Sequence, residues 1–193
     1  MLLVMFMLFD VPPVLPPGFS YTPEFISSEE EQRLIGQIRN TELKAFQFHG
    51  YEGKRRTANY GYNWSFENRT LSKGRPIPEH FHWLIERAAG HTGIPMDEIV
   101  QLLLIEYPPG AVINWYPDAP PFGTIMGLSL QGERTFRLRP HDKKKQGRGS
   151  IISLRVAPRS LYVIQGEARS EWEHATLPED DVRCSITLRT LRS

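Results

Sequence analysis

Apolar and polar residues follow a helical spacing in two segments of the first half of the chain. The pair Ser27–Ser28 precedes the pair Glu30–Glu31 at capping-box spacing, and an apolar face follows, so a helix is predicted over residues 28–39. A second helix is predicted over residues 78–91, where apolar residues recur at helical spacing: Phe81, Leu84, Ile85 and Ala88.

The segment between these helices, FHGYEGKRRTANYGYNWSFENR, is rich in Gly, Tyr, Asn and Arg and has no clean period. Irregular hairpins of the kind that often carry binding residues are expected there. After residue 100 the pattern changes to short strands separated by turn residues. The predicted strands are LLLIEY, VINWY, TIMGLSL, TFRLR, IISLR, SLYVI and CSITLRTL.

This order of elements predicts an α+β domain. The strands are expected to form a double-stranded β-helix, or jelly roll, with the N-terminal helices packed on one sheet. A chain of 193 residues suits one such domain, expected over residues 18–193. Residues 1–17 are expected to form an apolar and proline-rich leader. Its MLLVMFMLF stretch is too short to span a bilayer and lacks the pattern of a signal peptide.

Composition limits the cellular compartments and the kinds of partner that are expected for the protein. Cys184 is the single cysteine, which excludes an internal disulfide and indicates a reducing compartment. A cytoplasmic monomer without membrane attachment is therefore expected. The net charge of +1 argues against a strongly basic nucleic-acid binder as a whole. Basic residues do cluster between residues 134 and 148, which indicates either a phosphate-binding patch or a solvated hairpin loop.

The last predicted strand carries two arginines on one face. Strand alternation places Arg183 and Arg189 on the same side, about 20 Å apart by rise alone. If both side chains lean inward, they could grip opposite ends of a small dicarboxylate. The alternative is an edge strand that shows both arginines to water.

His174 and Asp118 add a second group with possible chemistry. An aspartate on one strand, a later histidine and an arginine soon after it form a pattern more specific than a lone histidine. Two histidines and one carboxylate are the ligand set of non-haem Fe(II) oxygenases. Two residues before Asp118, however, the chain has Tyr116.

Five motifs together resemble the AlkB-like family of Fe(II)- and 2-oxoglutarate-dependent dioxygenases. They are YPPG, WYPDAPPFG, GLSL, RSLYVIQGEARSEWEH and RCSITLRTLR. Upstream, LPPGFSYTPEFISSEEEQRLI and FHGYEGKRR are similar to the family's entry helix and substrate lid, so a lid is expected over about residues 45–70. The resemblance runs from about Leu15 to Arg192.

The resemblance implies a role for each matching residue. Asp118 and His174 would be catalytic iron ligands, and Tyr116 would stand at the third ligand position. The co-substrate 2-oxoglutarate would be held by three further residues: Tyr107, Arg183 at its distal carboxylate and Arg189 near its keto-acid end. The lid would offer aromatic surface to a flipped base through Tyr62 and Trp64.

Three positions depart from the family pattern. Tyr116 replaces a histidine, Ile105 replaces an asparagine that often reaches the co-substrate, and Pro120 replaces an acidic residue that reads the base in some relatives. A phenol must ionise to bind a metal as phenolate, and lowering its pKa from about 10 to 7 requires roughly 4 kcal/mol. Losing a histidine ligand is therefore expected to impair the metal site.

Two functions follow from these residues. The favoured hypothesis is oxidative demethylation or dealkylation that uses Fe(II) and 2-oxoglutarate, with alkylated DNA or RNA as the expected substrate and a protein side chain as another. The alternative is a catalytically impaired relative that binds nucleic acid or a protein partner without turnover. Asp118, His174, Arg183 and Arg189 occur together, which favours the first.

Overall fold

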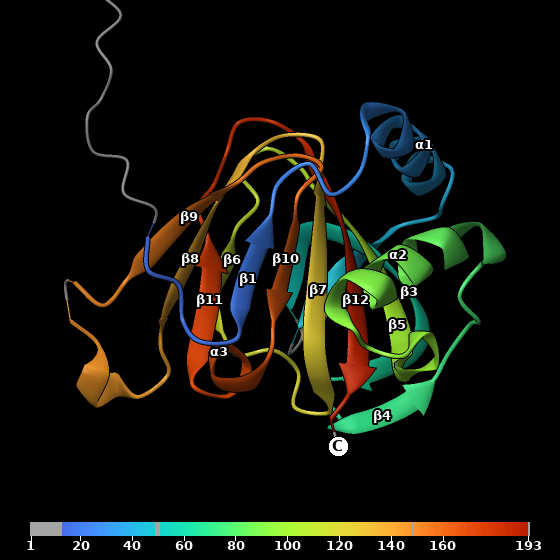
Figure 1. Ribbon diagram of the computed structural model, residues 1–193. Helices are drawn as coiled ribbons and strands as arrows, with labels where there is room; N and C mark the ends of the chain where they lie inside the picture. The colour runs from blue at the N-terminus through green and yellow to red at the C-terminus, as the bar shows by residue number, and fades with distance from the viewer. Residues whose placement is uncertain (1–12, 49–50, 148, 193) are drawn as a thin grey trace, which may run out of the picture.

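The protein folds as two antiparallel β-sheets that face each other, with helices on the outer face of the larger sheet (Figure 1). This architecture is seen in a computed structural model, which describes residues 13–48, 51–147 and 149–192. It confirms the predicted jelly roll with helices against one sheet. The two sheets enclose the space in which the predicted site residues meet.

The larger sheet has eight strands and the smaller has four. In spatial order, the larger sheet consists of β1 (Phe19–Thr22), β10 (Leu161–Ile164), β7 (Phe122–Leu130), β12 (Arg183–Leu191), β5 (Ile99–Tyr107), β3 (Tyr51–Ser65) and β2 (Lys44–Phe48), and β4 (Thr70–Lys73) pairs with β3. The smaller sheet consists of β6 (Ile113–Tyr116), β11 (Trp172–Thr176), β8 (Arg134–Pro140) and β9 (Ile152–Val156).

Both predicted helices are confirmed. Helix α1 covers Ser28–Arg39, and the capping box forms between Ser27 and Glu30. The second predicted helix begins as the 3-10 turn η1 (Glu79–Phe81) and continues as α2 (His82–Thr92). The short remaining elements are η2 (Met96–Glu98), η3 (Lys143–Lys145) and α3 (Gly166–Ser170).

The main hydrophobic core lies between these helices and the larger sheet. Its members include Leu34 and Ile38 of α1, Leu84 of α2, and Leu102 and Leu104 of β5. The helices cover this face of the sheet (Figure 1). The opposite face of the same strands lines a cavity.

Strand β12 shows the predicted alternation. Cys184, Ile186 and Leu188 belong to the main core, whereas Arg183 and Arg189 line the cavity. The strand lies between β7 and β5, so the alternative of an exposed edge strand is wrong. Its central position explains why Arg183 is buried.

Cys184 provides a test of this core. Burial raises the pKa of the Cys184 thiol to about 11, so very little thiolate exists at pH 8. We expect native protein to react with iodoacetamide on the order of a hundredfold more slowly than protein unfolded in guanidinium chloride. Mass spectrometry of quenched samples measures both rates. Equal rates would show that β12 opens readily in the native state.

The prediction of irregular hairpins between the helices is confirmed in part: β3 forms hairpins with β2 and β4, but it is one long strand that the sequence pattern did not reveal. These strands belong to a meander, in which the 15-residue strand β3 pairs with β2, β5 and β4 in turn, and the β2–β3 register shifts between Ala45 and Phe46. The bend lies at Gly61, whose φ of +80° is unfavourable for other residues and where a Cβ would lie 2.0 Å from the Val100 carbonyl oxygen. A segment rich in Tyr, Asn and Gly does not look like a strand in sequence. It forms one here because pairing with distant strands outweighs the local preference.

Other parts of the prediction have mixed outcomes. All seven predicted strands are confirmed, whereas β1 and β11 were missed in addition to the meander.

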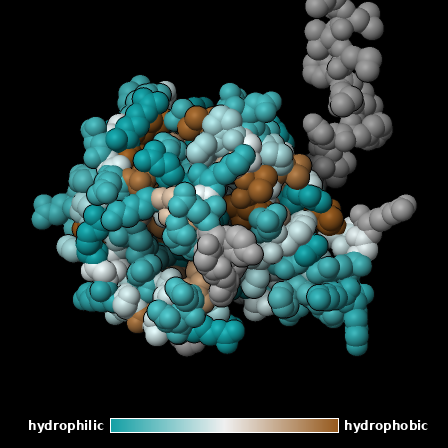
Figure 2. Space-filling model, turned by 180° about the vertical axis from the view of Figure 1, so that it is seen from behind, coloured by the Kyte–Doolittle hydropathy of each residue, from teal (hydrophilic) through white to brown (hydrophobic). Residues whose placement is uncertain are grey.

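Most of the predicted leader lies outside the described residues. In the described part of the chain, no helix is long and apolar enough to cross a membrane. The face seen in Figure 2 is mostly hydrophilic, with apolar side chains gathered near its middle.

Candidate functional site

A cavity of about 400 Å³ lies between the two sheets. Strands β3, β5, β7 and β12 of the larger sheet contribute to its lining, as do β6, β8 and β11 of the smaller sheet. It combines buried charge with aromatic side chains. Of the predicted site residues, all but Tyr62 line it: Trp64, Tyr107, Tyr116, Asp118, His174, Arg183 and Arg189.

Strand pairing brings Tyr116, Asp118 and His174 together. His174 of β11 lies opposite Tyr116 of β6, and their ring centroids are 4.7 Å apart. Asp118 follows β6, and its Oδ2 atom lies 3.6 Å from His174 Nδ1. His174 was expected after a strand and a turn, but it lies within β11, which the sequence pattern did not reveal.

Arg189 approaches this group from the larger sheet. Its Nη2 atom lies 3.3 Å from Asp118 Oδ1, and its Nη1 atom donates a 2.7 Å hydrogen bond to Gln101 Oε1. Both charged side chains are almost completely buried. Arg189 therefore holds the Asp118 carboxylate in place and links β12 to β5.

The protonation states of this group follow from its burial. Burial lowers the pKa of His174, although the Asp118 carboxylate acts in the opposite direction, so the imidazole is neutral at pH 7. Burial raises the pKa of the Tyr116 phenol, and Asp118 raises it further. Tyr116 therefore offers a protonated hydroxyl group, which is a poor metal donor.

The described residues do not fit the family's three-ligand iron site. Asp118 and His174 supply one carboxylate and one imidazole, and the third position is the Tyr116 phenol. Within residues 13–48, 51–147 and 149–192, no group of three or more His, Cys, Asp or Glu side chains could hold a metal ion. Two histidines and one carboxylate are needed for the Fe(II) triad.

The opposite end of the cavity is suited to an anion. Arg183 donates from Nε to Ser129 Oγ at 3.1 Å, and its guanidinium lies 5.1 Å from the Tyr107 ring centroid. Arg134 lies 5.2 Å from the same centroid. Among the described residues, neither arginine forms an ion pair with a carboxylate. Arg183 and Tyr107 thus lie together, as the resemblance implies.

Arg134 is the residue that the sequence prediction misplaced. It was grouped with the basic residues up to 148, yet its side chain is 1% exposed and lines the cavity. Strand alternation offers the signal, because Arg134 shares its face of β8 with the buried Phe136 and Leu138.

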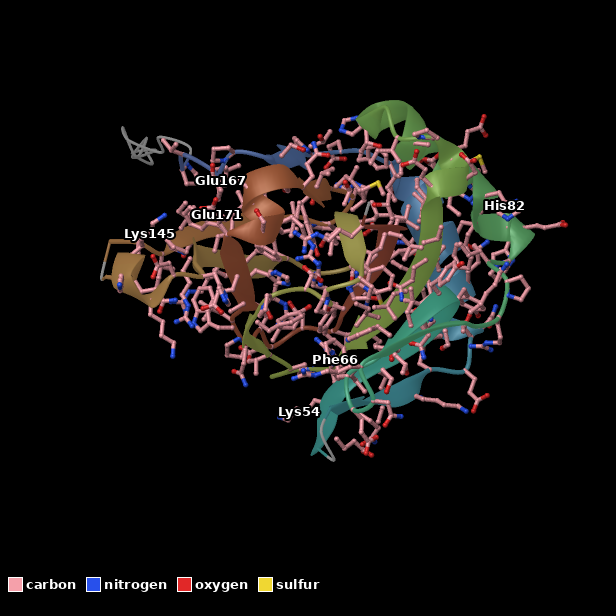
Figure 3. The ribbon with its side chains drawn as sticks, turned by 90° about the horizontal axis from the view of Figure 1, so that it is seen from below. Lys54, Phe66, His82, Lys145, Glu167 and Glu171 are labelled. Carbon is pink, nitrogen blue, oxygen red and sulfur yellow. The ribbon has the colours of Figure 1, made fainter. Side chains whose placement is uncertain are left out.

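The rest of that basic cluster is divided between two places. Arg137 and Arg139 stack on Trp115, and Arg139 also pairs with Glu173. The exposed Lys143–Lys145 turn follows, which matches the solvated-loop alternative, and Arg148 lies outside the described residues. Figure 3 shows Lys145 beside Glu171, well separated from Phe66 of the cavity lining.

Residues of the segment predicted to form a lid, 45–70, line part of the cavity. Trp64, Phe46 and Phe66 line it, and the Arg55 guanidinium lies 3.8 Å from the Phe46 ring centroid. Figure 3 shows Phe66 on the β3 side of the molecule, near Lys54. Tyr62 is not among the lining residues; its backbone carbonyl instead accepts hydrogen bonds from Asn59 and Gln101.

Comparison with known proteins agrees with this geometry. Residues 18–189 match the model of the 2OG-Fe(II) oxygenase superfamily. The chain is 30% identical over 180 residues to the mouse tRNA (carboxymethyluridine(34)-5-O)-methyltransferase ALKBH8, covering 89% of this chain and 26% of that protein. It is 26% identical over 213 residues to the "Alkylated DNA repair protein ALKBH8 homolog" of Arabidopsis thaliana, covering 92% and 59%.

The fold has a solved counterpart in OsALKBH1. That structure superposes with a TM-score of 0.71 at 15% identity, covering 93% of this chain and all of the other, which shows a shared double-stranded β-helix. The chain therefore belongs to the 2OG-Fe(II) oxygenase superfamily, and its relatives are AlkB-like proteins. It spans about a quarter of the length of the vertebrate relatives.

Proposed function

We propose that the cavity binds 2-oxoglutarate together with an alkylated nucleobase of a nucleic acid, and that Tyr116 keeps the chain from efficient oxidative dealkylation. One observation carries this proposal. The anion-binding end, the Asp118–His174 pair and the aromatic lid lie in one cavity, but the third iron ligand is a phenol. Fe(II) and 2-oxoglutarate are the cofactor and co-substrate that the superfamily's name describes.

Each part of the cavity has a role in this proposal. Arg183 and Tyr107 bind the distal carboxylate of 2-oxoglutarate by charge and hydrogen bonding. Arg189 orients Asp118 through the ion pair described above. Trp64 provides a flat apolar surface on which a base can stack. No catalytic step through iron follows from this donor set.

A nucleic-acid substrate is supported by the lid and by the names of the relatives. Arg55 and Trp64 combine positive charge with an aromatic face at the cavity, as single-strand binding sites do. The mouse relative is named as a tRNA methyltransferase, and the plant relative as an alkylated DNA repair protein. A protein substrate, a cytoplasmic location and a monomeric state stay predictions from the sequence.

A second function is favoured by the position of Tyr116. Its ring lies directly against His174, so an incoming metal could displace the phenolic proton and bind the phenolate. Such a hard anionic donor would make the chain a dioxygenase with an unusual ligand set. Tyrosinate ligation of ferric haem shows that phenolate can serve as an iron ligand.

Two substitutions at one position distinguish these functions. We expect Tyr116→His to bind Fe(II) about 10-fold or more tightly than the natural chain, because imidazole donates without losing a proton. Anaerobic titration with Fe(II) and 2-oxoglutarate should then show the visible charge-transfer band of the chelated complex. Succinate release on adding oxygen measures turnover.

Tyr116→Phe is the matched control, because it removes only the hydroxyl group. If Tyr116 is no ligand, the Phe variant and the natural chain should have the same weak affinity for Fe(II). A natural chain that turns over 2-oxoglutarate, with loss in the Phe variant, would establish the phenolate function instead. Failure of every variant to bind 2-oxoglutarate would reject the proposed co-substrate.

A further inference from the structure

Arg134 is a buried cation whose hydrogen-bonding capacity is only partly used. Its Nη1 atom donates to the carbonyl oxygens of Ala111 and Leu177, each at 2.8 Å. Its Nε and Nη2 atoms are buried and have no hydrogen-bond partner among the residues that the structure describes. A buried guanidinium with unused donors is energetically unfavourable unless a bound group supplies the missing acceptors, and an anion also offsets its charge.

A second cation lies next to it. Arg134 and Arg183 both contact the Tyr107 ring, and their like charges repel each other. Burial lowers the pKa of Arg134, and Arg183 lowers it further. An anion bound between two such cations relieves both the repulsion and the lost solvation.

The nearest candidate for an internal counter-ion is already engaged elsewhere. Glu179 Oε1 accepts hydrogen bonds from the backbone nitrogen and hydroxyl group of Thr135, and it pairs with Arg155 at 3.2 Å. Arg155 also pairs with Glu133 at the surface. Within the described chain, no carboxylate forms an ion pair with Arg134 or Arg183, so the anion must come from outside.

We propose that Arg134 and Arg183 form a two-arginine site that holds a small dicarboxylate in this cavity without any metal. This inference rests on the proposed binding of 2-oxoglutarate and adds Arg134 as a binding residue. The first carboxylate accepts hydrogen bonds from both guanidinium groups beside Tyr107. Both arginines present donors in a planar fork that matches carboxylate geometry.

A second carboxylate has a donor available further along β12. In the described part of the chain the buried Nε atom of Arg189 has no hydrogen-bond partner, although its two terminal nitrogens bind Gln101 and Asp118. Thr187 lies between Arg183 and Arg189 on the same face of the strand and also lines the cavity. The cavity thus has an unused donor toward each end, which suits a diacid better than a monoacid, although the Arg189 charge is already shared with Asp118.

Independence from metal follows from the donor set. Where a three-ligand iron site is present, the keto acid can chelate the metal, so the keto oxygen contributes to affinity. Here the described residues do not fit that site. The affinity must then come from the carboxylate contacts, and glutarate, which lacks the keto oxygen, should bind about as well as 2-oxoglutarate.

Calorimetric titration in the presence of EDTA tests this directly. We expect 2-oxoglutarate and glutarate to have similar dissociation constants. Butyrate lacks the second carboxylate and should bind about 10-fold more weakly or worse, because charge-assisted hydrogen bonds are lost. Inorganic phosphate is the fourth probe. If phosphate bound and the diacids did not, the site would be a phosphate site and the inference would be overturned.

Substitutions on β8 assign the effect to Arg134. Arg134→Gln keeps an amide donor for the two carbonyl groups but removes the charge, and it should weaken glutarate binding about 10-fold or more. Arg134→Lys retains the charge, so its affinity for glutarate should lie between that of Arg134→Gln and that of the natural chain. Arg137→Gln is the matched control, because Arg137 stacks on Trp115 outside the cavity lining.

Melting temperatures separate binding from a merely structural role. Glutarate should raise the melting temperature of the natural chain and of Arg137→Gln, but much less that of Arg134→Gln. Unchanged glutarate affinity in Arg134→Gln would overturn the role of Arg134. Diacid binding that requires Fe(II) would overturn metal independence and leave the proposed function intact. No diacid binding with or without Fe(II) would reject both.

Discussion

Arg189→Met is expected to lower the free energy of unfolding by about 3–5 kcal/mol, because it leaves a buried carboxylate without its cation. Asp118 and Arg189 are 3.3 Å apart, and their side chains are only 4% and 11% exposed. The substitution also removes the 2.7 Å hydrogen bond to Gln101. Urea denaturation followed by circular dichroism measures the change.

A double substitution identifies the cause of that loss. Asp118→Asn removes the charge that Arg189→Met leaves uncompensated, so the double variant should be more stable than the Arg189→Met variant. Arg192→Met is the control, since the exposed Arg192 uses its backbone nitrogen rather than an ion pair and should change stability by about 0.5 kcal/mol or less. If the Arg189→Met variant were as stable as this control, Asp118 would not depend on the ion pair.

Phe81→Ala is expected to lower the free energy of unfolding by about 3–5 kcal/mol, because it opens a cavity in the main core. The Phe81 side chain is 0% exposed, and it lies at the turn through which η1 enters α2. Unlike Arg189, it belongs to the helix side of the larger sheet. Urea denaturation again measures the loss.

The position of Phe81 also predicts what should not change. The site lies on the opposite face of the sheet, so folded Phe81→Ala protein should bind 2-oxoglutarate as the natural chain does. His82→Ala, at the exposed neighbouring position, should change stability by about 0.5 kcal/mol or less. A Phe81→Ala variant that is folded but has lost binding would show that the two faces are coupled.

The local sequence pattern was enough to predict the two helices and the two faces of β12. Capping and helical spacing located α1 and α2 because those signals depend on residues within a few positions of one another. Alternation along β12 separated the core residues from Arg183 and Arg189 for the same reason. The motifs around Asp118 and His174 identified the family, which the superfamily match confirms.

Local pattern failed where distant contacts decide the outcome. Strand β3 forms in a segment rich in Gly and Asn because β2, β4 and β5 supply its hydrogen bonds. Likewise, β11 is specified by pairing with β6 and β8, and that pairing places His174 against Tyr116.

The sequence alone thus determined which chemical groups are present, including the phenol at residue 116 in place of a histidine. Only the tertiary structure decided how they combine. In the folded protein Arg189 contacts Asp118 and Gln101. Trp64 lines the cavity and Tyr62 does not. Arg134 lies beside Arg183 at the Tyr107 ring. These contacts form because the two sheets pack face to face and bring together strands that are distant in the chain. No local periodicity encodes such a contact.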